Sequence, residues 1–385
     1  MEKFSAFRDP GTGIQPFLKP VPPLGSETLA YLALPFGYVV GAIRLSLIVV
    51  LGLLYAIVVR GFCPVLIVVP PLYRLVTQFL TALICRLVLL LIGLWWIPVD
   101  VVARKRGRSQ KLSEDWNPQA GDIIVSNWVS FVEILWLAFR FNPVFVLPIR
   151  SSADTTSPAS ESLASPVRTP GRRTGTGSAA LSLPSARTPS PRVPIRGFRR
   201  ASLLSMLRAT GHVPISAQPG TAELEKLLSM EEIRNKADRP VVVFPECTTS
   251  NGRGLLRFAE IFREVKVPVT KFNVFVMCVR YDPPTALQPT LTHSIPSTVI
   301  NPLPHLLTLA MSLAPLTVSI RLLAPSESPS SRAFLASEYV TGEQPVDLLS
   351  EACTSLIAHT GKMKRLGMGW EDKVAFLDFY NGKKK

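Results

Sequence analysis

The spacing of apolar and polar residues divides the chain into a long hydrophobic region and a mixed region. Apolar residues dominate from 29 to 98, where arginines keep each charge-free run shorter than the roughly 18 residues of an uninterrupted bilayer span. These arginines are Arg44, Arg60, Arg74 and Arg86. Arginines near the ends of a span can extend to the headgroups. The pattern predicts either two spanning helices, about 36–59 and 75–97, or a re-entrant hairpin in one leaflet; both return the chain to its starting side.

From residue 122 onward, short β-rich runs alternate with helical patterns, which predicts an α/β domain. The predicted strands are 122–126, 143–148, 212–216, 240–244, 274–281 and 317–323. The predicted helices are 131–141, 201–209, 222–235 with Thr221 as N-cap, 254–262 and 346–360. The apolar stretch 300–313 fits a short helix at a membrane surface or in the domain core, and it is too short to span.

The segment 151–194 interrupts this alternation with Ser, Thr, Pro, Ala and Arg, and its scarcity of large apolar groups predicts a disordered insert. Five of its hydroxyl residues precede proline: Ser157, Ser165, Thr169, Thr188 and Ser190. They are hypothesised targets of proline-directed kinases, and a neutral spacer is the alternative. The predicted organisation is a tail (1–28), hydrophobic helices (29–99), a domain in two pieces (100–150 and 195–380), this insert between them, and a basic tail (381–385).

Composition and charge favour a membrane-associated protein. The 385 residues are 47% hydrophobic with a net charge of +15, and a basic cluster at 104–111 follows the hydrophobic region directly. Basic flanks stay in the cytosol and attract anionic headgroups, so the charge needs no nucleic-acid partner, and we expect none. The chain does not open like a cleavable signal peptide, so we expect the hydrophobic region to be retained. Five cysteines without paired spacing indicate neither disulfides nor a metal site, as is typical of a reducing compartment.

The run 244–253, Phe-Pro-Glu-Cys-Thr-Thr-Ser-Asn-Gly-Arg, carries the strongest candidate chemistry. It follows a β-branched strand and leads into the expected helix at 254–262. The hydroxyls of Thr248, Thr249 and Ser250, the helix N-terminus and the guanidinium of Arg253 are groups that recognise a phosphate ester. An ordinary strand-to-loop turn is the alternative. Cys247 could carry an acyl group, but nothing nearby in the sequence activates its thiol.

This run resembles the phosphate-handling block of the PlsC-type glycerolipid acyltransferases, which have glycine where Cys247 stands. The order of segments is similar to the fungal lysophosphatidic acid:oleoyl-CoA acyltransferase group, with Trp-Glu-Asp-Lys at 370–373 as further support. The resemblance covers about 115–380, apart from the insert. It implies an α/β fold with an acyltransferase-type mixed sheet flanked by helices, preceded by the membrane hairpin.

The resemblance also implies a reaction and a location. The reaction is acyl transfer from acyl-CoA, as co-substrate, to the free hydroxyl of lysophosphatidic acid or a related lysophospholipid, giving phosphatidic acid with no bound cofactor or metal. Membrane lipids, acyl-CoA and a lysophospholipid are the expected partners. The location would be the endoplasmic reticulum membrane or lipid droplets, with the domain on the cytosolic side.

The catalytic motif of that family, histidine with aspartate five positions later, is changed here. Trp128 stands at the histidine position and Glu133 at that of the aspartate. An indole cannot accept a proton, so the candidate catalytic set is Trp128, Ser130 and Glu133, with Glu133 as base if burial raises its pKa. The same residues could instead be packing surface, and His212 remains a possible base. Glu246 is expected to support the acceptor site.

Loss of the histidine leaves a second function open. A catalytically inactive protein of the same fold could keep the lipid-phosphate pocket and act in lipid binding, lipid-droplet biology or vesicle trafficking. A membrane scaffold without a ligand is a third reading of the same residues.

Overall fold

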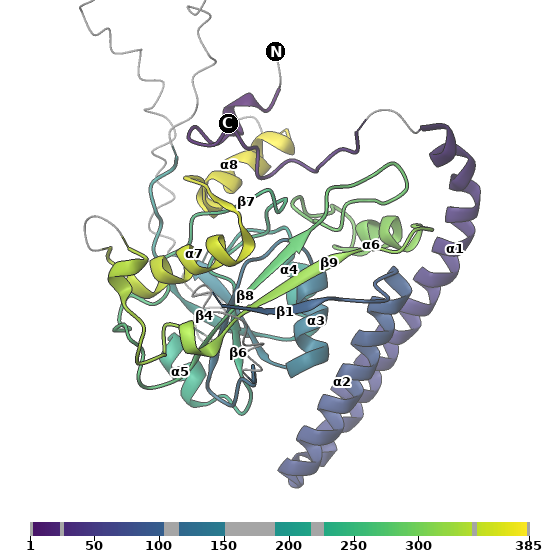
Figure 1. The fold of residues 1–385 in the computed structure, drawn as a ribbon. Helices are drawn as coiled ribbons and strands as arrows, with labels where there is room; N and C mark the ends of the chain where they lie inside the picture. The colour runs from purple at the N-terminus through teal and green to yellow at the C-terminus, as the bar shows by residue number, and fades with distance from the viewer. Residues whose placement is uncertain are drawn as a thin grey trace, which may run out of the picture.

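The computed structural model describes residues 3–23, 27–103, 115–150, 189–216, 227–340 and 345–382. Its centre is a mixed sheet in the order β1-β9-β8-β2-β6-β3-β4, with the short β5 paired to β3. The strands are β1 (Val99–Val102), β2 (Ile123–Ser126), β3 (Val144–Arg150), β4 (Ile195–Ala201), β5 (Ile215–Ser216), β6 (Val241–Val243), β8 (Val274–Tyr281) and β9 (Val318–Leu323). This confirms the α/β class with helices on both faces of a sheet (Figure 1).

The central strands are parallel and buried on both faces. β2 pairs in parallel with β6 and β8, and β3 pairs in parallel with β6. Every residue of β2 and β6 is buried, which is why these strands are continuous apolar runs in the sequence. One face packs against α2 (Pro70–Ile92) and α3 (Val132–Phe141), and the other against α7 (Leu348–Gly361). The carboxyl ends of β2 and β6 therefore open onto a shared edge of the sheet.

Two edge strands were not expected from the sequence. β4 carries three arginines and lies at the edge of the sheet, antiparallel to β3, so its polar side chains reach solvent. Its Gly197 has no room for a side chain, because a Cβ there would lie 2.8 Å from the Leu227 side chain. β1 is a four-residue, largely exposed strand at the opposite edge. Exposed edge strands lack the apolar run by which buried strands are recognised.

Most expected helices are present with small shifts in their bounds. They are α3, α4 (Leu203–Ala209), α6 (Leu303–Ala310) and α7, and α5 is the shorter Met230–Asn235. α5 starts at Ser229, whose side chain and that of Glu232 form a capping box. The expected cap at Thr221 lies outside the described residues, as do 151–188 of the insert and the basic cluster 104–111.

The expected helix at 254–262 is wrong. Gly254–Leu255 forms a short strand, β7, parallel to β10 (Lys364–Arg365), and the following residues are irregular. The amide of Leu256 donates to the carboxylate of Glu246, and that of Arg257 donates to the carbonyl of Met368. These amides are used by tertiary partners, so the helix N-terminus expected at residue 254 does not form.

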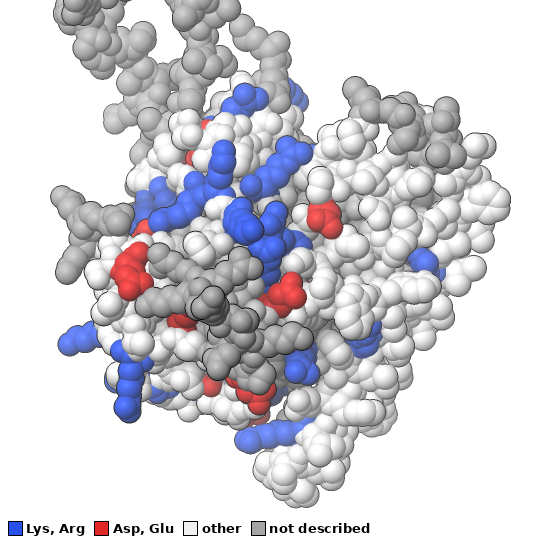
Figure 2. All heavy atoms as spheres, viewed as in Figure 1, with Lys and Arg blue, Asp and Glu red and all other residues white. Residues whose placement is uncertain are grey.

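The hydrophobic region folds as a helical hairpin on one flank of the domain. α1 (Glu27–Leu54) continues through a π-helical turn, Tyr55–Phe62, and a 3₁₀ turn, Cys63–Val68, before α2. Both helical stretches are long and apolar enough to cross a membrane, by length and composition. α2 ends at Ile92 rather than near 97, because Gly93 adopts a left-handed conformation with φ 104° and closes the helix. Figure 2 shows this flank as an almost uncharged surface.

Two glycines let α1 contact the domain closely. Gly37 and Gly41, one turn apart, face the main chain and side chain of Met311 at the end of α6. One turn further along α1, the Arg44 guanidinium donates to the carbonyls of Ala310 and Ser312, at 3.2 and 2.8 Å. The terminal carbonyls of α6 are thus satisfied by a side chain of α1.

This contact makes a specific prediction for Gly41→Leu. A Cβ at position 41 would lie 2.5 Å from Met311 Cγ, so the larger side chain forces α1 and α6 apart. We expect the substitution to destabilise the protein by roughly 1–3 kcal/mol, measured as a lower thermal midpoint in detergent. Gly52→Leu is the matched control, because nothing lies within 4 Å of a Cβ at Gly52. Equal midpoints for both variants would contradict the contact.

Candidate functional site

The loop after β6 is buried, and its hydroxyls serve the fold. Thr248, Thr249 and Ser250 have no exposed surface. Thr248 Oγ1 donates to the carbonyl of His212 at 2.7 Å, and Thr249 Oγ1 to that of His293 at 2.5 Å. Ser250 Oγ accepts the amide of Gly252 at 3.2 Å. The predicted phosphate-binding hydroxyls therefore hold neighbouring segments in place, and a phosphate contact by them stays a prediction.

A buried carboxylate joins this loop to the loop after β2. Glu246 accepts the amide of Trp128 at 2.6 Å through one oxygen and the amide of Leu256 at 2.8 Å through the other. Burial raises its pKa to about 8, Glu133 adds to the rise, and the two amides and Lys373 oppose it. Glu246 thus supports the site structurally, by holding the two loops together.

Lys373 lies on the other side of the same loop, at the start of α8 (Trp370–Tyr380). Its ammonium is wholly buried and donates to the carbonyl of Thr249 at 2.7 Å. Burial lowers the pKa of Lys373 well below its usual range, and Glu246 opposes that shift. The Trp-Glu-Asp-Lys segment noted in the sequence is therefore the support of this loop.

Glu133 holds the turn that contains Trp128. Its Oε1 accepts the amides of Val129 at 2.5 Å and Ser130 at 2.6 Å, and its Oε2 accepts the hydroxyl of Tyr281. Burial raises the pKa of Glu133 to about 7, and Tyr281 and the two amides oppose the rise, so the direction expected from the sequence is found. Both carboxylate oxygens are nevertheless engaged within the protein. This geometry fits a positioning role better than that of a base.

Trp128 faces a cavity that Glu133 does not line. The cavity has a volume of about 300 Å³ and is lined by Trp128 and Cys247 together with Arg199, Arg208 and His212. The Trp128 ring stacks on Phe244 with centroids 5.1 Å apart, and its Nε1 donates to the carbonyl of Ser130. Trp128 is thus fixed from both sides as one wall of the cavity.

Cys247 lines the cavity from a left-handed turn. Its φ is 57°, a conformation that favours glycine, and the turn directs the chain from β6 into the loop. Burial raises the pKa of the Cys247 thiol well above its usual range, which leaves it protonated and poorly nucleophilic. The structure therefore offers no activation of this thiol.

The cations at the cavity are not the one chosen from the sequence. Arg253 is exposed and does not belong to the cavity lining, so a phosphate contact by it stays a prediction. Arg199 comes from β4 and Arg208 from the last turn of α4. Arg199 was missed because β4 was unexpected, and Arg208 because the expected helix did not show which way its side chain points. The density of arginine at 196–208 was the available signal. His212 follows α4 and lines the same cavity as Trp128.

Two further histidines lie behind the Trp128 turn. His293 donates its amide to the carbonyl of Val129, and its ring contacts Asn301 at 2.7 Å and the His305 ring at 4.8 Å between centroids. Burial lowers the pKa of His293 to about 4 and that of His305 to about 3. Both rings are neutral near pH 7 and belong to the packing of the turn.

The N-terminal segment 3–23 covers the end of the loop. Asn251 donates from its side-chain amide to the carbonyls of Gln15 and Leu18, at 2.7 and 2.9 Å. Phe17 packs on Phe376 of α8, with centroids 5.5 Å apart. Figure 1 shows this segment running from α8 across the top of the domain to α1. The loop after β6 is therefore contacted by segments from both ends of the chain.

A comparison with known proteins gives one informative similarity. A Schizosaccharomyces pombe protein with the name "Putative lysophosphatidic acid:oleoyl-CoA acyltransferase" is 24% identical over 386 residues, covering 98% of each chain. No family model and no solved structure matches this chain. The full-length similarity suggests an acyltransferase family with a role in lipid metabolism.

The buried carboxylate of Glu246 predicts a pH-dependent stability. Its folded pKa of about 8 lies above the unfolded value near 4.5, so its contribution is fully present below pH 4.5 and is lost as pH rises through 8. We expect the free energy of unfolding to fall between pH 6.5 and 8, by up to about 1.4 kcal/mol per pH unit. Glu133, with a folded pKa of about 7, adds to the fall in this window. His293 and His305 oppose it, because their unfolded imidazoles are half protonated near pH 6.5 while the folded ones are neutral. The contribution of Glu246 is therefore the difference in pH slope between Glu246→Gln and the unsubstituted protein.

The measurement is chemical denaturation of the detergent-solubilised protein at pH 6.5 and 8. Glu246→Gln should flatten the decrease, whereas Glu264→Gln, at an exposed glutamate, should leave it unchanged. The same pH slope in Glu246→Gln and in the unsubstituted protein would contradict the assignment.

Proposed function

We propose that this protein is a membrane-bound acyltransferase that transfers a fatty acyl group from acyl-CoA to lysophosphatidic acid or a related lysophospholipid. The observation that carries the proposal is the cavity beside Trp128, where Arg199, Arg208 and His212 meet at the motif position. The name of the similar fission-yeast protein supports the reaction and the two substrates. No cofactor is required; acyl-CoA is the co-substrate.

The two arginines are suited to the phosphate of the acceptor. A guanidinium presents parallel donors that match phosphate oxygens. Arg199 and Arg208 come from different elements, so they can approach a phosphate from two directions. The 300 Å³ volume of the cavity suits a glycerol phosphate headgroup.

His212 is the proposed general base. The surrounding protein and the charge of Lys373 lower its pKa, so the imidazole is neutral near pH 7 and able to accept a proton. It would take the proton of the glycerol hydroxyl as that oxygen attacks the thioester carbonyl. The new oxygen–carbon bond forms, the carbon–sulfur bond breaks, and the CoA thiolate leaves and takes up a proton.

The first test is acyl transfer by purified protein in nanodiscs, with labelled acyl-CoA and lysophosphatidic acid. We expect His212→Gln to lower kcat by roughly 100-fold or more with little change in KM. Arg208→Gln should raise KM for the lysophospholipid by about tenfold, since it removes a charged contact to the phosphate. Glu133→Gln tests the base expected from the sequence, and Arg253→Gln tests the phosphate contact expected from it. Arg140→Gln is the control, because Arg140 is exposed and lies outside the cavity lining. Full activity of both His212→Gln and Arg208→Gln would contradict the proposed site.

A second function, lipid binding without turnover, is favoured by a different observation. An indole occupies the motif position, and both oxygens of Glu133 accept hydrogen bonds within the protein. A protein with this arrangement would hold the headgroup and act in lipid-droplet or vesicle-trafficking roles. Binding of lysophosphatidic acid that Arg208→Gln abolishes, without turnover on any acceptor, would select this alternative.

We further propose that the hairpin enters one leaflet and does not cross the bilayer. One face of α2 is buried against the domain from Thr77 to Ile92, and its first turn reaches the domain through Arg74 and Asp238, 3.6 Å apart. A helix crossing the bilayer could not be covered along its length by a water-exposed domain. The connection 61–73 contains no charged residue, and Val65 and Val68 are among its most exposed side chains.

In this proposed arrangement the cavity would lie on the side of the membrane that carries the domain. The basic cluster 104–111 argues for the cytosolic side, and the implied lipid chemistry for the endoplasmic reticulum or lipid droplets. A hairpin in one leaflet is compatible with the single phospholipid layer of a droplet. A pair of helices that spans a bilayer is not compatible with a single phospholipid layer.

Labelling in sealed vesicles tests the topology. A cysteine at Val68 should react with a membrane-impermeant maleimide only after detergent is added, because the tip lies in the hydrocarbon. Leu335→Cys, on an exposed surface of the domain, is the control that should react in intact vesicles. The five native cysteines are buried and give little background. Reaction of Val68→Cys from the side opposite to Leu335→Cys would show that the hairpin crosses.

A further inference from the structure

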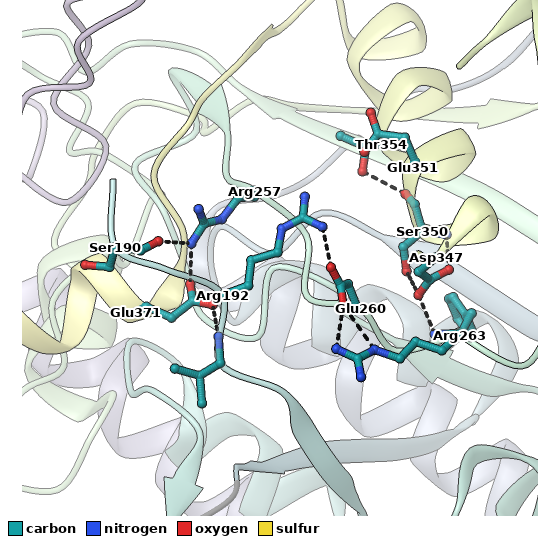
Figure 3. Close-up of polar contacts among 12 residues, drawn as sticks. Ser190, Arg192, Arg257, Glu260, Arg263, Asp347, Ser350, Glu351, Thr354 and Glu371 are labelled. Carbon is teal, nitrogen blue, oxygen red and sulfur yellow. Dashed lines mark hydrogen bonds and ion pairs between the residues drawn. The ribbon is translucent and has the colours of Figure 1, made fainter. Parts of the chain in front are cut away.

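The residues that lead into β4 are fixed on the first turn of α8. The amide of Ser190 donates to Asp372 Oδ1 at 2.8 Å, and its carbonyl accepts from Arg257 Nη2 at 2.7 Å. The amide of Val193 donates to Glu371 Oε1 at 3.1 Å, and Glu371 Oε2 also accepts from Arg257 at 3.2 Å. Figure 3 shows Ser190, Arg257 and Glu371 directed toward one another. We call residues 189–193 the docked segment.

A second ion pair holds the far end of the docked segment. Arg192 Nη1 lies 2.7 Å from Glu260 Oε1, and Glu260 Oε2 also accepts from Arg263 (Figure 3). The docked segment contains neither helix nor strand, so side chains of other elements supply these contacts. It is a stretch of extended chain held by polar contacts rather than by an apolar core.

The same turn of α8 carries the buried support of the candidate site. Asp372 caps the helix by accepting the amide of Gly369 at 2.9 Å, and the next residue, Lys373, donates to Thr249 at 2.7 Å. Asp372 and Lys373 are both fully buried. The docked segment and the loop after β6 are thus joined through two adjacent residues of one helical turn.

Ser190 has the sequence and the position of a modification site. It precedes Pro191, its side chain is partly exposed, and it lies in extended chain, which is the form in which kinases accept a substrate. We propose that Ser190 is phosphorylated by a proline-directed kinase, and that the phosphoserine releases the docked segment from α8. In the reaction Ser190 Oγ attacks the γ-phosphorus of a nucleoside triphosphate. The new oxygen–phosphorus bond forms, and the bond from the γ-phosphorus to the oxygen that bridges to the β-phosphate breaks. The nucleoside diphosphate leaves, and the hydroxyl proton passes to the kinase.

Charge explains the release. A phosphoserine carries close to two negative charges at neutral pH, and its own amide is bound to the carboxylate of Asp372. Glu371, with a side chain only 7% exposed, is the second carboxylate beside it. Arg257 is the one cation among these partners, and it is already bound to Glu371 and to the Ser190 carbonyl. The repulsion between the phosphate and two poorly solvated carboxylates therefore exceeds its attraction to one guanidinium that is already shared. The docked segment then separates from α8.

The experiment treats the purified full chain with a proline-directed kinase and ATP, then maps phosphate by mass spectrometry. We expect phosphate on Ser190 in the folded protein. Hydrogen exchange of peptides covering 189–194 should then be at least tenfold faster, because the amides of Ser190 and Val193 lose their carboxylate partners. The proposal does not depend on acyl transfer, so failure of one leaves the other standing.

Two variants separate the proposed cause from other effects of the kinase. Ser190→Ala, treated in the same way, still presents its other Ser-Pro and Thr-Pro sites and should show no faster exchange at 189–194. Asp372→Asn removes one of the two carboxylates and should reduce the acceleration caused by phosphate on Ser190; Glu371→Gln serves the same purpose if Asp372→Asn does not fold. A free peptide of 184–197 that is phosphorylated at Ser190 while the folded protein is not would overturn the proposal. Unchanged exchange in the phosphorylated protein would overturn it as well.

Discussion

The arrangement of the site depends on one buried carboxylate. Glu246 accepts an amide from each of two loops that are more than a hundred residues apart in the chain, at Trp128 and at Leu256. Without Glu246, the amides of Trp128 and Leu256 would be buried without hydrogen-bond partners. Burying an unpaired amide costs more free energy than a hydrogen bond contributes on balance. The bridge holds the Trp128 turn against the loop that contains the left-handed Cys247, and it ties both to the residue that follows β7. Glu246 is thus a requirement of the geometry before any question of chemistry arises.

The buried parts of the fold were accessible from the sequence, and the edges were not. β2, β6 and β8 are continuous apolar runs because both faces of the sheet are covered, and their positions match the expected strands closely. β4 was missed because an edge strand can expose arginines, as Ile195–Ala201 does. The helix expected at 254–262 failed for another reason: its local pattern is helical, but its amides have tertiary acceptors that no local pattern reveals.

Some features of the candidate site could likewise be predicted from the sequence, and others could not. The importance of the run 244–253 and the unusual residues Trp128 and Glu133 could be read from spacing, and the raised pKa of Glu133 followed from its apolar neighbours. The direction of each side chain could not. The hydroxyls of Thr248 and Thr249 point to main-chain carbonyls, Arg253 points to solvent, and the cations at the cavity come from segments whose secondary structure was partly unrecognised. Chemistry assigned from a motif assumes that its side chains share a surface, and here they are divided between core, cavity and solvent.

The small volume of the cavity has a consequence for how a lipid would reach it. At about 300 Å³ it suits the proposed glycerol phosphate headgroup and is small for a long acyl chain. Withdrawing an 18-carbon chain from a bilayer costs on the order of 14 kcal/mol, at about 0.8 kcal/mol for each methylene. A protein that binds only the headgroup avoids that cost, since the chain stays among its neighbours in the leaflet. For the proposed lysophospholipid substrate, encounter would then be a search in two dimensions, limited by lateral diffusion and by the surface density of that lipid rather than by its concentration in water.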